Sequence, residues 1–371
     1  YKADYDILAM TDHGVITNGW TSERETNGIF NKFRKVYPMS EENYERITKG
    51  LDRGGRGMTD IRGGIECNMA VISKTHVNGY FTTYGQGEWG IENDYRTAPV
   101  EIEKAGGYSV LNHVGDWVDS GRFPHRSHWN VYIAYFAGIF IDCPSCLGME
   151  IVNNTDRVTR GDRELWDELL QVVIPKGRNI WAFADDDSEK LNEVGRSFEF
   201  FVLPENNEAN VKKAMKDGNF FAASKYYKTT DGVGDFDGDG NVPLVTDIKV
   251  DQKANTKTVA TDPTRDCRVI EWIADGKVIA TGNTIDLNDY EKDLGCYIRF
   301  QMKGSGGVTY SQPFELQYKG RIDKPVPSWA LWAFKTEAGQ KFMKFYHSRS
   351  FALGAFIAEK IRILIEDNIK K

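Results

Sequence analysis

Residues 5–12 have the sequence Tyr-Asp-Ile-Leu-Ala-Met-Thr-Asp, and His13 follows directly. The apolar run in this stretch is typical of a short, fully buried strand. The carboxyl end of that strand carries Asp12 and His13, whose side chains can take part in chemistry. Because α/β proteins place their functional sites at the carboxyl ends of parallel strands, we expect a functional site to begin here.

Similar apolar runs recur further along the chain and alternate with helical patterns. The predicted strands are 64–70, 108–112, 148–153 and 180–184, and the predicted helices between them include 98–105 and 162–173. A further helix is predicted over 207–217. Repeated strand–helix units favour a parallel sheet or a barrel. We therefore expect an α/β fold.

The pattern changes after a loop rich in glycine and aspartate that ends at Pro243. Short runs rich in β-branched and aromatic residues extend over 244–319, and an Asp275-Gly276 turn between 269–274 and 277–281 predicts a hairpin. These features predict a small, all-β sandwich as an auxiliary domain. Residues 328–371 predict a helical C-terminal segment, because apolar residues recur there at helical spacing: Leu353, Phe356, Ile357, Ile361, Leu364 and Ile365.

Composition and charge exclude several classes of protein. The chain has 371 residues, of which 40% are hydrophobic and 27% charged, as in ordinary globular proteins. Its net charge of -7 leaves no global basic surface for a nucleic-acid backbone. The longest apolar runs fall short of the roughly 20 residues that span a bilayer. We therefore expect neither a nucleic-acid partner nor a membrane, while the oligomeric state is not predicted.

The cysteines bear on the cellular compartment. Five cysteines are too few and too scattered for a disulfide scaffold. Cys143 and Cys146 form a single CxxC with no second pair, which favours free thiols over a zinc or redox site. Unpaired thiols and an acidic composition favour a cytoplasmic protein, whereas the aspartate-rich loop before Pro243 favours a secreted one.

Histidines and acidic residues stand at or just after the predicted strands. A divalent ion needs carboxylate or neutral imidazole ligands that converge from separate elements. The carboxyl-end mouth of a barrel is where separate strands converge. We therefore expect a metal site built from the residues that follow the strands in this order: His13, Glu66, His76, His113, Asp187 and Glu189, with Asp185 and Asp186 close by.

Six motifs, which occur in order between residues 4 and 224, resemble those of the PHP superfamily, the polymerase and histidinol phosphatase metal-dependent hydrolases. The first is the stretch 6–13, which resembles D-x-x-x-x-T-D-H. The others lie at 64–66, 75–80, 107–113, 148–153 and 218–224, and they are similar to G-I-E, H-[VI]-L-G-Y, G-G-x-x-x-x-x-H-P, G-x-E-V-x-N and G-R-F-Y-A-S. The shared order of the motifs is far more specific than any single one.

The resemblance implies a distorted (β/α)7 TIM-like barrel over residues 1–228 that holds two or three divalent ions, namely zinc, manganese or iron. Such ions activate water against a phosphate or another ester of a small molecule. The resemblance also implies that the ligands include His13, Glu66, His76, His113 and Asp187, with Glu66 as the bridge between two ions. It makes His13, Glu66 and Asp187 the expected catalytic residues of a phosphoesterase.

The chain departs from the family pattern at two places. The family's opening H-x-H strand would lie upstream of Tyr1, so we expect residues that precede Tyr1 to supply it. The family's closing D-A-H corresponds to Asp187-Ser188-Glu189, which puts Glu189 at the histidine position as a carboxylate ligand. A carboxylate favours harder ions such as Mn²⁺ or Mg²⁺ over Zn²⁺.

The loop after His113 contains the predicted substrate-binding residues. Arg122 and His128 carry side chains that can bind an anionic substrate, and His125 and Arg126 lie in the same loop. Two other functions fit the same sequence. The chain can be a degenerate, non-catalytic barrel that serves as a binding or regulatory module, or a hydrolase of carboxylic or carbamate esters.

Overall fold

The computed structural model describes most of the chain, namely residues 1–23, 38–67, 75–87, 94–318, 321, 323–325 and 336–346. Within these residues the fold is mixed α/β, with strands in several sheets. The predicted apolar repeat between Leu353 and Ile365 lies outside the described residues.

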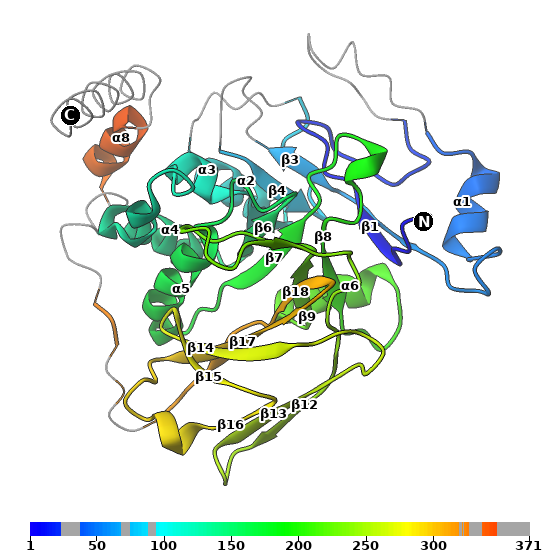
Figure 1. Cartoon of the computed structure of the whole chain (residues 1–371). Coiled ribbons are helices and arrows are strands. Elements are labelled where there is room, and N and C mark those ends of the chain that lie inside the picture. Colours follow the sequence, from blue (N-terminus) through cyan, green and yellow to red (C-terminus); the bar gives the residue numbers. More distant parts are fainter. Residues whose placement is uncertain are drawn as a thin grey trace, which may run out of the picture.

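A five-stranded sheet organises the first part of the chain (Figure 1). Its order is β3-β4-β5-β6-β7, with the bounds β3 Ile65–Cys67, β4 Val77–Tyr80, β5 Tyr108–Leu111, β6 Cys146–Asn153 and β7 Trp181–Asp185. The strand β4 is antiparallel to both of its neighbours, whereas β5, β6 and β7 are parallel. The amino end of β4 therefore lies beside the carboxyl ends of β3 and β5.

Helices connect these strands and pack on the sheet. The helix α2 (Thr97–Lys104) precedes β5, α4 (Asn130–Asp142) joins β5 to β6, and α5 (Asp162–Val173) joins β6 to β7. All three contribute to one apolar cluster with the sheet. Because α4 is apolar nearly all round, its side chains are buried on most sides. The predicted helices at 98–105 and 162–173 are confirmed, and so are the parallel strands predicted at 108–112, 148–153 and 180–184. The strand predicted at 64–70 is present as β3, but it pairs antiparallel with β4, and residues 68–70 lie outside the described residues.

The strand β1 (Ile7–Ala9) is shorter and less buried than predicted. It pairs in parallel with β2 (Thr59–Ile61), and among the described residues no strand lies on its other side. Ile7 and Ala9 pack on the cluster that contains Ile61. Leu8 points the other way and is 38% exposed. The prediction of a fully buried strand over 5–12 is therefore wrong.

A second sheet joins strands from both sides of the predicted domain boundary. Its order is β15-β14-β17-β18-β9-β8, and β19 pairs with β17. The bounds are β8 Ser197–Phe201, β9 Phe220–Ser224, β14 Val269–Ala274, β15 Lys277–Thr281, β17 Tyr297–Gly304, β18 Gly307–Tyr310 and β19 Phe314–Glu315. Because β9 is bonded to β18, strands from 1–228 and from 244–319 share one sheet.

The predicted hairpin is confirmed as β14 and β15. Its turn residues, Asp275 and Gly276, have φ angles of 48° and 75°, as a two-residue hairpin turn of type I′ requires. A separate three-stranded sheet consists of β12 (Val245–Asp251), β13 (Thr256–Thr261) and β16 (Thr284–Asp286). This sheet and the hairpin's sheet share an apolar cluster, so the two sheets pack against each other.

The remaining elements complete the described fold: α1 Glu41–Thr48, α3 Val114–Val118, α6 Glu208–Asp217, β10 Tyr226–Tyr227, β11 Phe236–Asp237, α8 Glu337–Tyr346 and four short 3₁₀ helices. The helix α6 confirms the prediction for 207–217, and α8 falls within the predicted helical segment 328–371. No sheet of the described residues closes into a barrel.

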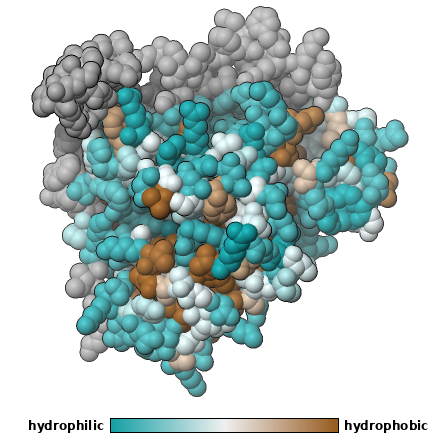
Figure 2. Space-filling model, in the orientation of Figure 1, coloured by the Kyte–Doolittle hydropathy of each residue, from teal (hydrophilic) through white to brown (hydrophobic). Residues whose placement is uncertain are grey.

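Two further expectations concern the surface and the thiols. Hydrophilic residues predominate on the face in Figure 2, and apolar patches interrupt them over a small area. No helix among the described residues is both long and apolar enough to cross a bilayer. All five cysteines are free, as predicted.

Candidate metal centre

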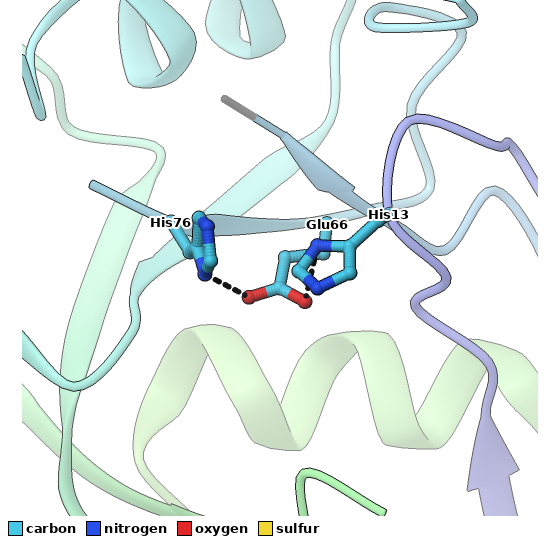
Figure 3. Close-up of side chains that lie close together, drawn as sticks. All are labelled: His13, Glu66 and His76. Carbon is cyan, nitrogen blue, oxygen red and sulfur yellow. Dashed lines mark ion pairs between the residues drawn. The ribbon is translucent and has the colours of Figure 1, made fainter. Parts of the chain in front are cut away.

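Three side chains from separate segments converge at one edge of the five-stranded sheet: His13, Glu66 and His76 (Figure 3). Glu66 is the central residue of β3, and His13 forms an isolated parallel bridge with it. The Glu66 N–H donates to Asp12 O at 3.1 Å, and the Gly14 N–H donates to Glu66 O at 2.8 Å. His76 directly precedes β4, and the reversed direction of β4 brings it to the same edge.

The two carboxylate oxygens of Glu66 face different histidines (Figure 3). Oε2 lies 3.0 Å from His13 Nδ1, and Oε1 lies 3.1 Å from His76 Nδ1. One ligand atom from each of the three residues lies within 4.8 Å of the other two. Glu66 is only 6% exposed, so its carboxylate is shielded from solvent. The group therefore offers nitrogen and oxygen donors around a buried carboxylate.

A third histidine reaches the same carboxylate from the next strand. His113 follows β5, and its Nε2 lies 3.2 Å from His76 Nδ1 and 3.8 Å from Glu66 Oε1. The φ angle of His113 is 29°, in the left-handed region that residues other than glycine rarely adopt. Its backbone N–H donates to the carboxylate of Glu150. Backbone strain of this kind is concentrated at functional sites, which points to a role for His113.

Glu66 and His113 both have pKa values that differ from their usual ranges. Burial by itself would raise the pKa of Glu66, but its interactions with His113, His76 and His13 outweigh burial and hold the pKa well below its usual range. Burial by itself would lower the pKa of His113, but the interaction with the negatively charged Glu66 raises it. Metal ions bind the ionised carboxylate and the neutral imidazole, so a metal ion competes with protons at the histidines.

Asp187 lies on the loop after β7, beside the same group. Its Oδ2 accepts a hydrogen bond from Asn153 Nδ2 at 3.2 Å, and Asn153 Nδ2 also lies 3.1 Å from Glu150 Oε1. The charge of Asp187 contributes to the raised pKa of His113, after the larger effects of burial and Glu66. The structure therefore brings Asp187 to the His113 side of the group.

The structure does not bring Glu189 to the three histidines within the part of the chain that it describes. Glu189 is exposed on the same loop, and its backbone N–H donates to Glu193 Oε2 at 2.9 Å. Asp187 and Glu189 lie on the same loop, and Asp187 is linked to His113 through Asn153 and Glu150. That Glu189 is a metal ligand stays a prediction.

Sequence reasoning assigned no role to three polar residues that the structure places at the site: Asn112, Glu150 and Asn153. Asn112 donates to Glu66, and Glu150 accepts from the His113 backbone. Glu150 and Asn153 face the same side of β6 because the register shifts between Glu150 and Val152. Asn112 and Asn153 end predicted strands, which was the available signal, whereas Glu150 lies inside the strand predicted at 148–153.

Asp185 and Asp186, which precede Asp187, have different surroundings. Asp185 ends β7, and burial together with the charges of Asp186 and Asp187 raises its pKa to about 6, even though a hydrogen bond from Glu150 acts in the opposite direction. Asp186 anchors the following loop instead. Its Oδ1 accepts from the backbone N–H groups of Arg196 and Ser197 at 2.6 and 3.0 Å. Its Oδ2 accepts from Tyr5 Oη and from the Gly195 N–H at 2.7 and 2.9 Å.

We expect Asp186→Ala to destabilise the protein by about 2–3 kcal/mol, because it leaves several partly buried donors without their charged acceptor. Urea unfolding followed by circular dichroism measures this loss. Asp217→Ala is the control, since Asp217 forms an exposed pair with Lys213, and its replacement should cost less than about 0.5 kcal/mol. Equal losses in both variants would contradict the anchoring role.

The predicted substrate-binding residues contact other parts of the fold. His128 ends the 3₁₀ helix Pro124–His128 and pairs with α5, where its Nδ1 lies 2.9 Å from Glu168 Oε1 and its Nε2 lies 3.5 Å from Glu164 Oε2. The guanidinium of Arg122 lies 5.0 Å from the centre of the Phe123 ring. Substrate binding by Arg122 and His128 stays a prediction.

The stability that His128 contributes should depend on pH. Hydrogen bonds to Glu164 and Glu168 raise its pKa from 6.5 to about 9. A raised pKa stabilises the fold fully below about pH 6.5, and this stabilisation is lost as the pH rises through about 9. We expect His128→Gln to cost at most about 1 kcal/mol near pH 6 and almost nothing near pH 10, because the pair is half exposed. Urea unfolding at both pH values tests this, and equal losses would contradict it.

Comparisons with known proteins do not assign the chain to a family. No protein-family model matches it, and neither a curated protein nor a solved structure does. Membership of the PHP superfamily therefore stays a prediction that rests on the order of the six motifs. The convergence of His13, Glu66 and His76 is a separate observation, because it comes from the geometry of the structure.

Proposed function

We propose that this chain is a metal-dependent hydrolase, and that its substrate is a small phosphate ester. The observation that carries the proposal is the group of His13, Glu66 and His76, in which Glu66 is buried and both histidines are partly exposed, with His113 next to it. Imidazole nitrogens and carboxylate oxygens are the donors that zinc, manganese and iron bind in proteins. Two or three such ions are proposed, in line with the PHP resemblance.

The charges of the group fit a divalent ion. Glu66 is buried and ionised, and among the described residues its ion pairs are all with histidines rather than with lysine or arginine. An imidazole is positively charged only when it is protonated, whereas a buried carboxylate needs a lasting positive partner. A divalent ion held by Glu66 and the histidines would supply that charge and leave the histidines neutral.

Each residue has a defined part in this proposal. A divalent ion held by the group supplies an activated water and positive charge for attack on a phosphate ester. Glu66 directs its two oxygens to different histidines, so it is the residue that would bridge two ions if both were bound. Asp187 adds a carboxylate on the His113 side, and Glu189 is the further ligand that the resemblance supplies. Arg122 and His128 are proposed to hold the anionic part of the substrate.

The finer architecture and the cellular compartment belong to the same proposal. Residues 1–228 are proposed to form a distorted barrel, which the β5-α4-β6-α5-β7 succession supports. Residues 244–319 are proposed to form a β-sandwich, which the apolar cluster shared by two sheets supports. The free cysteines favour the cytoplasm.

Elemental analysis of the purified chain and a paired-substrate assay test the proposed function. After chelation the protein is reloaded with Mn²⁺, Zn²⁺ or Fe²⁺ and offered p-nitrophenyl phosphate or p-nitrophenyl acetate. We expect bound metal and phosphate-ester hydrolysis that chelation abolishes. Acetate hydrolysis alone would replace the phosphoesterase by a carboxylic-ester hydrolase. Bound metal without turnover of either ester would favour a binding module, and absence of bound metal would overturn the proposal.

A further inference from the structure

Asn112 links the Glu66 carboxylate to the backbone of the central sheet. It directly follows β5 and is only 3% exposed. Its Nδ2 donates to Glu66 Oε1 at 3.0 Å, and its Oδ1 accepts from the Asn78 N–H at 3.2 Å. Because a backbone N–H can only donate, the amide oxygen must face Asn78, and the amide nitrogen must then face Glu66.

The backbone of Asn112 is held as firmly as its side chain. Its N–H donates to His76 O at 3.0 Å, and its carbonyl accepts from the Tyr95 hydroxyl at 2.8 Å. Asn112 therefore connects the backbone of one ligand candidate, His76, to the carboxylate of another, Glu66.

The contact acts on one half of the Glu66 carboxylate. Asn112 donates to Oε1, the oxygen that lies 3.1 Å from His76 and 3.8 Å from His113. The other oxygen, Oε2, faces His13. Since the amide fixes one oxygen, it also fixes the rotation of the carboxylate plane, and hence the direction in which both oxygens present their lone pairs.

We propose that Asn112 is a positioning residue that orients Glu66 for metal binding and so sets the affinity and the coordination geometry of the site. The inference rests on the proposed function, since it needs a metal ion at His13, Glu66 and His76. Partners of metal ligands that lie outside the coordination sphere typically contribute 10–100-fold to metal affinity.

Asn78 provides a matched control. It is also 3% exposed, it pairs with Val110 in the adjacent strand, and its Nδ2 donates to Tyr80 Oη at 3.3 Å instead of to Glu66. Replacing its side chain leaves the backbone N–H that donates to Asn112. Asn78→Leu and Asn112→Leu therefore make the same chemical change, but only Asn112→Leu removes the contact to Glu66.

The experiment uses Zn²⁺ and Co²⁺ as probes on the full chain. Competition with a chromogenic chelator measures Zn²⁺ affinity, and the visible absorption band of saturating Co²⁺ reports the coordination geometry. We expect Asn112→Leu to weaken Zn²⁺ binding by about 10–100-fold and to change the Co²⁺ band, and Asn78→Leu to change affinity by less than about threefold and to keep the band. Asn112→Ala serves if the leucine variant does not fold.

The outcomes separate the inference from the proposed function. Wild-type affinity and an unchanged Co²⁺ band in the folded Asn112 variant would overturn the positioning role and leave the metal site intact. Equal effects of the Asn78 and Asn112 variants would also overturn it, because the contact with Glu66 would then be irrelevant. A wild-type chain that binds neither ion would overturn the proposed function itself.

Discussion

Glu66→Gln is expected to reduce metal-dependent hydrolysis at least about 100-fold and to weaken metal binding strongly. The variant keeps the shape of the side chain but removes the negative charge and one oxygen donor from the centre of the group. The fold should persist, because an uncharged amide costs less to bury than a carboxylate. Turnover of p-nitrophenyl phosphate and the metal content of the purified variant measure the effect.

Glu103→Gln is the matched control for this variant. The Glu103 carboxylate accepts hydrogen bonds from the backbone and hydroxyl of Ser145, outside the histidine group. The same change at Glu103 should therefore leave metal content and turnover unaltered. Wild-type turnover of Glu66→Gln at saturating metal would show that Glu66 is not a bridging ligand.

The largest expected loss of stability is at Asp167. This residue of α5 is 4% exposed and accepts hydrogen bonds from Arg299 Nε and Nη2 at 2.7 and 2.6 Å. The Tyr297 hydroxyl donates to it at 2.6 Å. Arg299 and Tyr297 lie on β17, so this buried ion pair connects a helix of the predicted barrel to a strand of the predicted sandwich.

We expect Asp167→Asn to cost about 3–5 kcal/mol of unfolding free energy, because it leaves the Arg299 guanidinium buried without a counter-charge. The double variant Asp167→Leu/Arg299→Met should recover much of that loss, since it removes both buried charges. Urea unfolding measures both changes. Glu45→Gln is the control, because Glu45 forms an exposed ion pair with Lys49. A loss below about 1 kcal/mol would contradict the role of the pair as a buried connection.

Unfolding of the wild-type chain also tests whether the predicted barrel and the predicted sandwich are independent domains. The hydrogen bonds between β9 and β18 and the Asp167–Arg299 pair both cross the boundary predicted between 228 and 244. We therefore expect the wild-type chain to unfold in one transition when fluorescence and circular dichroism are compared. Two separate transitions would show that the sandwich is an independent unit, as the sequence predicts.

The sequence by itself determined the elements whose signals are local. The Asp275-Gly276 turn fixed the hairpin of β14 and β15 because its two residues tolerate positive φ angles. The apolar periodicity fixed α5 to the residue, at Asp162–Val173. His13 just after one apolar run and Glu66 within the next indicated a metal site.

Only the tertiary structure decided which of the predicted ligands meet. The reversed direction of β4 places His76 beside Glu66, the bulge in β6 turns Glu150 and Asn153 to one side, and Glu189 is left on an exposed loop. It also decided that Leu8 is exposed and that strands of both predicted domains share one sheet. Turns and periodicity depend on neighbours in sequence, whereas strand direction, register and burial depend on pairings between residues far apart in the chain.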